Sequence, residues 1–173
     1  MALERTGYGP HVYDGGAPSA GTSEIQTLTI GGTPSAGYQF KIEFEGYYTA
    51  AIDWSATNGT LVANIDAALE LLPNIGTGGV TTAVGTMTSG VGTITLTMAG
   101  NRARQNVPLM VASLVTSAGT SPTAVIATTT AGVDATFRGV PPGALLIDTT
   151  NTKLYINTGT AIAPTWTVAG TQT

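Results

Sequence analysis

Strict alternation of apolar and polar residues is the clearest pattern along this chain, and it is typical of β-strands with one buried face. Segment 38–45 alternates aromatic or aliphatic residues with lysine and glutamate, and segment 93–98 alternates threonine with aliphatic residues. Since side chains of a strand point to opposite faces in turn, the apolar set of each segment is expected in the core. These expected core residues are Phe40, Ile42, Phe44, Ile94, Leu96 and Met98.

Weaker patterns predict the remaining strands of a β-rich module. Segment 47–54 follows Gly46 and is expected to pair with the strand before it, with one face formed by Tyr48, Ala50, Ile52 and Trp54. Further strands are predicted at 25–30, 80–84, 91–98, 107–114 and 123–130.

One amphipathic helix is predicted at about residues 60–72. Its apolar residues recur at spacings of three and four, which places them on one stripe. Pro73 ends the helix, because the residue before a proline is biased out of the helical region. Asp66 and Glu70 lie off the stripe and are expected in solvent. The stripe consists of Leu61, Ile65, Ala68, Leu69 and Leu72.

These elements predict a mainly β protein with one helix (α+β), built on an antiparallel β-sandwich-like module. We divide the chain into an extended N-terminal arm at 1–23, a core module at 24–132 and a C-terminal β-hairpin unit at 133–173. The hairpin turns at Asn151. Its small core is expected to consist of Leu146, Leu154, Ile156 and Trp166.

Composition narrows the function classes. Charged residues make up 9% of the chain, there is no cysteine, and His11 is the single histidine. These counts exclude disulfides and thiolate metal sites and argue against a histidine metal cluster, so no metal or cofactor is expected. The net charge of −4 and the scattered lysines and arginines disfavour nucleic acid and anionic membranes as partners. No catalytic motif is present, so we expect a protein that is not an enzyme.

The only close pair of arginines, Arg102 and Arg104, lies in a polar loop at 100–106. Arginine can hold a carboxylate or a phosphate through two parallel hydrogen bonds. The pair is therefore a candidate subunit contact, and the alternative is a solvated loop without a partner.

Several stretches resemble a module that is common in structural proteins of tailed bacteriophages. Segment 38–46, followed by 49–52 and by the helix and turn at 64–76, matches its extended strand, threonine-rich partner strand and helix. Gly100 and the Val-Pro-Leu at 107–109 match a later segment of the module, which follows a strand. The ending at 146–173 is similar to C-terminal segments of phage virion proteins. The Arg102–Arg104 loop is not part of the pattern.

This resemblance implies a virion structural protein without catalytic residues. We expect a capsid decoration, or cement, protein that is made in the host bacterial cytoplasm and binds the outer capsid surface. Its partners would be the major capsid protein and copies of itself, with a trimer favoured by the closed symmetry of local capsid axes. The alternative is a tail tube, fibre or baseplate subunit, with glycan binding through Tyr47, Tyr48 or Trp54. The third hypothesis is a carbohydrate-active enzyme that uses two distant carboxylates.

Overall fold

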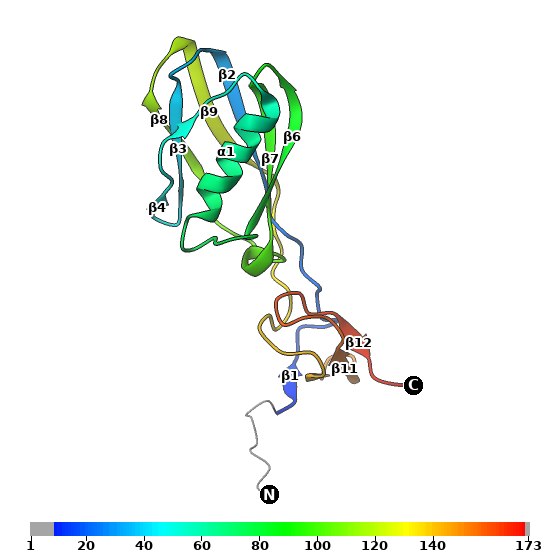
Figure 1. The fold of residues 1–173 in the computed structure, drawn as a ribbon. Coiled ribbons are helices and arrows are strands. Elements are labelled where there is room, and N and C mark those ends of the chain that lie inside the picture. The colour runs from blue at the N-terminus through cyan, green and yellow to red at the C-terminus, as the bar shows by residue number, and fades with distance from the viewer. Residues whose placement is uncertain (1–8, 172–173) are drawn as a thin grey trace, which may run out of the picture. The chain divides into compact units, whose positions relative to one another are not determined.

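The computed structural model describes residues 9–171. Their contacts divide the chain into two compact units. The larger unit is continuous, from Ser23 to Val133, and the smaller one combines residues 9–22 with residues 134–171. Figure 1 shows the elements of both units, and each unit is described by itself below.

The larger unit contains a four-stranded antiparallel sheet in the order β6-β7-β2-β9. Its buried residues all belong to one face, because partners in register share a face. The predicted core residues Ile94, Leu96 and Met98 are at most 1% exposed, which confirms the alternation in β7. The four strands are β2 (Ile25–Pro34), β6 (Val80–Thr88), β7 (Val91–Met98) and β9 (Gly119–Thr130).

The second sheet is centred on β3 (Gln39–Phe44). On one side β3 pairs with β4 (Tyr47–Tyr48) and β5 (Ile52–Asp53), and on the other with β8 (Val111–Thr116). The prediction of one continuous strand at 47–54 is therefore wrong. The chain leaves the ladder between β4 and β5, where the Thr49 hydroxyl accepts a hydrogen bond from the Ile42 amide at 3.0 Å.

Helix α1 (Asn58–Glu70) confirms the predicted amphipathic helix, two residues earlier than expected. Leu61, Ile65 and Leu69 are fully buried, whereas Leu71 is 81% exposed. The Asn58 side chain does not cap the helix, because it accepts a hydrogen bond from the Gly90 amide and donates one to the Met87 carbonyl oxygen. The N-cap position belongs to Thr57.

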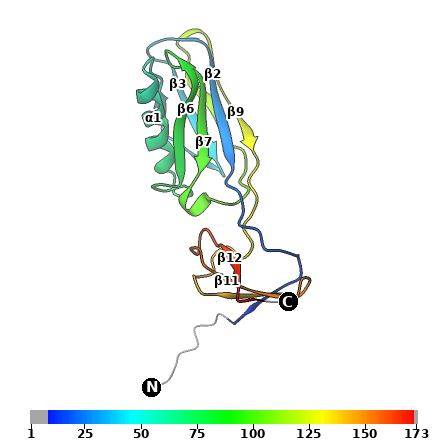
Figure 2. The same ribbon diagram turned by 90° about the vertical axis from the view of Figure 1, so that its right-hand side faces the viewer.

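The second sheet and α1 lie on the same side of the first sheet, as Figure 2 shows for α1. Between these layers lies one apolar core, and Phe40, Ile42 and Phe44 of β3 are buried in it without any exposed area. The predicted fold class is therefore confirmed: the protein is mainly β with one helix, and its larger unit resembles a two-layer sandwich.

The smaller unit holds a four-stranded sheet of its own, in the order β1-β10-β11-β12. Strands β10 (Leu145–Asp148) and β11 (Lys153–Asn157) form the hairpin, and β12 (Trp166–Val168) continues the sheet. Strand β1 (His11–Tyr13) pairs in parallel with β10. The expectation of an extended arm at 1–23 is thus corrected within the described residues, because residues 11–13 form a strand of this sheet; residues 1–8 lie outside the described residues.

The core of the smaller unit also differs from the prediction. Leu146 is fully buried, but Leu154 and Ile156 lie on the opposite face of the sheet. The buried positions of β11 are instead Tyr155 and Asn157. Periodicity alone did not distinguish the two faces, because both faces of this hairpin carry large apolar residues.

Candidate interaction surface

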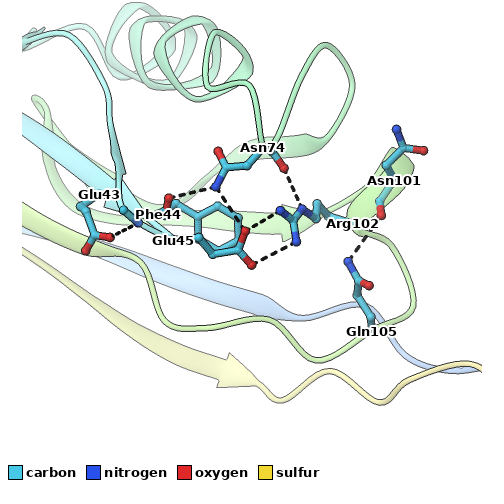
Figure 3. A network of polar contacts seen from close by, with 8 residues as sticks. Glu43, Phe44, Glu45, Asn74, Asn101, Arg102 and Gln105 are labelled. Atoms are coloured by element: carbon cyan, nitrogen blue, oxygen red, sulfur yellow. Dashed lines mark hydrogen bonds and ion pairs between the residues drawn. The ribbon is translucent and has the colours of Figure 1, made fainter.

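Arg102 lies at the end of a short 3-10 helix, η1 (Gly100–Arg102), and its guanidinium closes a polar clasp within the larger unit. It binds the Glu45 carboxylate through both terminal nitrogens, at 3.1 and 2.5 Å. Its Nε donates to the Asn74 carbonyl oxygen at 2.7 Å. Figure 3 shows the clasp, in which Asn74 also donates to the Phe44 carbonyl oxygen at 2.9 Å.

The clasp connects three segments that lie far apart in the sequence: the turn after β3, the loop after α1 and the loop after β7. The guanidinium also lies 5.3 Å from the centroid of the Phe44 ring, a favourable cation–π distance. The two side chains of the ion pair are 21% and 30% exposed, so water reaches them. Arg102 thus holds a carboxylate, as its residue type predicts, but the carboxylate belongs to its own chain.

Arg104 is held differently. Its backbone has a φ of +54°, and its amide donates to the Ser23 hydroxyl at 3.0 Å. The two arginines therefore serve separate contacts in the described structure, and their role in binding another subunit stays a prediction.

The candidate glycan-binding aromatic residues do not form a common platform. Tyr47 and Tyr48 are about half exposed but adjacent on β4, so they point to opposite faces of the strand. The Lys41 ammonium lies 4.5 Å from the Tyr48 ring centroid. Trp54 is half-buried against the core, and its indole nitrogen donates to the Gly90 carbonyl oxygen. Tyr48 is therefore exposed, whereas Ile52, which was expected on the same face, is buried.

The two acidic residues of α1 make contacts instead of pointing freely into solvent. Asp66 accepts a hydrogen bond from the Thr82 hydroxyl at 2.8 Å, and Glu70 accepts one from the Gly78 amide at 2.6 Å. They line an open groove between α1 and β6. Both carboxylates thereby attach the helix to the loop and strand that follow it. Within residues 9–171, no group of three or more histidine or acidic side chains could hold a metal ion.

Exposed aliphatic side chains gather along β8 and β9, which are edge strands of the two sheets of the larger unit. Val111, Leu114, Val115 and Val125 are each about half exposed. A groove between the strands, with a volume of about 220 Å³, is lined by aliphatic residues only. No residue from 105 to 133 is charged. This uncharged stretch is visible in the sequence and could have indicated the surface, but a search for motifs does not detect it.

A second aliphatic surface lies on the open face of the smaller unit's sheet. Val12 is 66% exposed, and Leu145 and Ile147 are also exposed. Leu154 and Ile156 share this face, because they pair in register with Ile147 and Leu145. Asp148, in contrast, is buried on the other face.

The outer face of the larger unit's main sheet is lined by threonine and other uncharged side chains. Thr93 pairs with Thr29 in the ladder, and Thr95 pairs with Thr27. The predicted outward direction of the β7 threonines is confirmed, because the alternate residues of β7 are buried. Both units therefore present broad uncharged surfaces.

Comparison with known proteins adds no relative to this description. No protein-family model matches the chain, and no curated protein matches it. In the part of the chain that the structure describes, no helix has the length and apolar character needed to span a membrane.

Proposed function

We propose that this protein is a non-enzymatic structural subunit of a tailed-bacteriophage particle, which binds the outer capsid surface as a decoration protein. The observation that carries the proposal is the exposure of uncharged aliphatic surfaces on both units, along β8 and β9 and on the open face of β10 and β11. The resemblance of segments 38–76 and 146–173 to phage virion proteins supports the same role.

Attachment would rest on apolar area and on backbone hydrogen bonding. Apolar burial contributes about 25 cal/mol per Å² before the cost of ordering is subtracted. Exposed ion pairs contribute at most about 1 kcal/mol each and are screened by salt. With six lysines and arginines and ten acidic residues in 173, charge supplies little of the attachment. Many identical weak contacts on one shell then add through multivalency.

Imaging of labelled particles tests the location. A copy of the chain that carries an electron-dense label is incorporated into virions, and the label is located by electron microscopy. Label over the head supports the decoration role. Label on the tail supports the alternative of a tail tube, fibre or baseplate subunit, for which the exposed Tyr47 and Tyr48 remain the candidate glycan contacts.

Washing purified particles tests the mode of attachment. The protein should stay on the shell in about 1 M NaCl, where the Debye length is about 3 Å. It should leave in a moderate denaturant concentration that keeps the shell intact. Release by salt alone would contradict attachment through apolar surfaces and would direct attention to Arg102 and Arg104 as the anchoring pair.

A further inference from the structure

The edge of β8 is an unprotected strand edge. Strand β8 pairs with β3 only, so its other edge faces away from the sheet. Natural proteins usually protect such edges with charged residues, because unpaired N–H and C=O groups recruit other strands. Here the strand and its flanks carry no charge from residue 105 to residue 133.

Hydrogen bonds of β3 reveal which backbone groups of β8 point outward. Ile42 uses its amide and carbonyl for Thr49, on the β4 side of the sheet. Its neighbours Lys41 and Glu43 therefore direct their backbone groups to β8, where they lie opposite Ser113 and Val111. It follows that Ala112 and Leu114 point their amides and carbonyls away from the sheet.

The side chain of Gln26 shows how the first part of this edge is satisfied. Its amide group donates to the Pro108 carbonyl oxygen at 3.0 Å and accepts from the Met110 amide at 2.9 Å. These two hydrogen bonds take the place of one backbone pair of a neighbouring strand, and Gln26 itself is fully buried. The Gln26 side chain reaches only as far as Met110, and the edge is unpaired from Ala112 onward.

We infer that a second copy of this chain pairs with this edge, β8 against β8 in antiparallel orientation about a two-fold axis at Ser113. In this register Ala112 lies opposite Leu114 of the other copy, and these residues exchange the outward backbone hydrogen bonds. Beyond Leu114 the ladder with β3 is irregular, because Phe40 pairs with Leu114 but Gln39 pairs with Thr116, so the regular register covers residues 112–114. Ser113 faces its own counterpart as a pair without backbone hydrogen bonds.

The chain itself favours this occupant over another protein strand. The register places the small Ala112 of one copy opposite the large Leu114 of the other. With no charge on the edge, two acidic copies can approach without local repulsion. The inference is independent of the proposed particle role, because the pairing requires no other component, and it is distinct from a three-fold contact.

Cysteine cross-linking tests the register in a chain that has no cysteine of its own. In a pair without backbone hydrogen bonds the Cα atoms are about 4.5 Å apart, which is within disulfide range. Ser113→Cys should form a disulfide-linked dimer under mild oxidation. Thr81→Cys is the matched control, because Thr81 is an exposed residue on β6, the edge strand at the other side of the main sheet.

Sedimentation of the wild-type chain supplies the second measurement. The chain should show a concentration-dependent dimer, and Ser113→Lys should weaken it at least about tenfold, because like charges directly opposite one another are unfavourable. Thr81→Lys should leave the dimer unchanged, and circular dichroism verifies the fold of each variant. A monomeric wild-type chain would overturn the inference, as would equal cross-linking of the Ser113 and Thr81 variants. A dimer or trimer that persists in folded Ser113→Lys would overturn it as well.

Discussion

The two units of this protein are stabilised in different ways. The larger unit buries aliphatic and aromatic side chains between two sheets and a helix, and its largest buried residues include Tyr38, Phe40 and Phe44. The smaller unit buries Asp148 and Asn157 beside Leu146 and Tyr155. A unit with so few residues cannot bury enough apolar area to be stabilised by its apolar core alone. Side-chain hydrogen bonds to the backbone therefore hold its loops in place.

Each unit contains one of the two tryptophans, which allows the comparison to be tested unit by unit. Trp54 belongs to the larger unit and Trp166 to the smaller one. Replacing either by phenylalanine leaves a fluorescence signal from one unit. The predictions that follow use these two backgrounds.

The largest effect is expected in the apolar core. Leu69→Ala should destabilise the larger unit by about 2–5 kcal/mol, as truncation of fully buried leucines does. Leu71→Ala, two residues further on and 81% exposed, should change stability by less than about 0.5 kcal/mol. Denaturant unfolding followed by Trp54 fluorescence measures both. Similar values for the two variants would mean that the helix stripe does not stabilise the core.

Asn157 is the corresponding test in the smaller unit. Its side-chain amide donates to the carbonyl oxygens of Val140 and Pro141, and its oxygen accepts from the amides of Gly159 and Thr165. Asn157→Ala should destabilise this unit by about 2–3 kcal/mol, because buried backbone groups lose their partners. The Trp166 signal should shift to lower denaturant while the Trp54 signal stays. A common shift of both signals would show that the two units unfold together.

The clasp of the larger unit should contribute less. Arg102→Leu is expected to cost about 1 kcal/mol, because water already reaches the ion pair. Glu45→Gln and the double variant complete a thermodynamic cycle that isolates the coupling between the two side chains. Coupling near zero would mean that Arg102 acts through its contacts with Asn74 and Phe44 instead.

The smallest effect is a pH dependence confined to the smaller unit. The side-chain hydrogen bond from Asn151, together with bonds from the Asn151 and Thr150 amides, lowers the pKa of Asp148 below its ordinary value of 3.8. Because the folded state favours the ionised form, Asp148 stabilises the smaller unit fully at pH values above the pKa that this carboxyl has in the unfolded chain. This stabilisation is lost as the pH falls through the lower pKa that Asp148 has in the folded state.

Thermal unfolding between pH 5 and pH 2, monitored by Trp166, checks this expectation. Asp148→Asn should reduce the loss of stability that the smaller unit shows at low pH, relative to the wild-type chain. If the loss of stability at low pH is the same in Asp148→Asn, other carboxylates cause it.

Elements with one buried face could be predicted from the sequence. The alternation in β3 and β7 and the stripe of α1 each distinguish a core side from a solvent side, so the observed bounds lie within about two residues of the predicted ones. The smaller unit offered no such contrast. Its hairpin has apolar residues on both faces, and hydropathy does not show that Asn157 is buried.

Contacts between distant segments were also beyond the sequence patterns. The parallel pairing of β1 with β10 joins residues more than a hundred positions apart. The sequence of residues 11–13 has no pattern that predicts this strand or its partner. The partner of Arg102 could not be identified for the same reason. Its residue type predicts a carboxylate, but only the fold brings Glu45 to it.

One contact of the larger unit has a consequence for the order of folding during synthesis. The Glu24 carboxylate accepts a hydrogen bond from the Gly132 amide at 2.6 Å, so the two ends of this unit meet. The smaller unit is made of the segments on either side and needs residues 134–171, which leave the ribosome after the larger unit. In the unfolded chain, pairing β1 with β10 means closing a flexible loop of more than a hundred residues, which costs entropy. Once the larger unit has folded, that loop is no longer flexible and this cost falls. The larger unit would therefore act as a preformed bridge, and a chain interrupted before β10 would carry a folded module without its second surface.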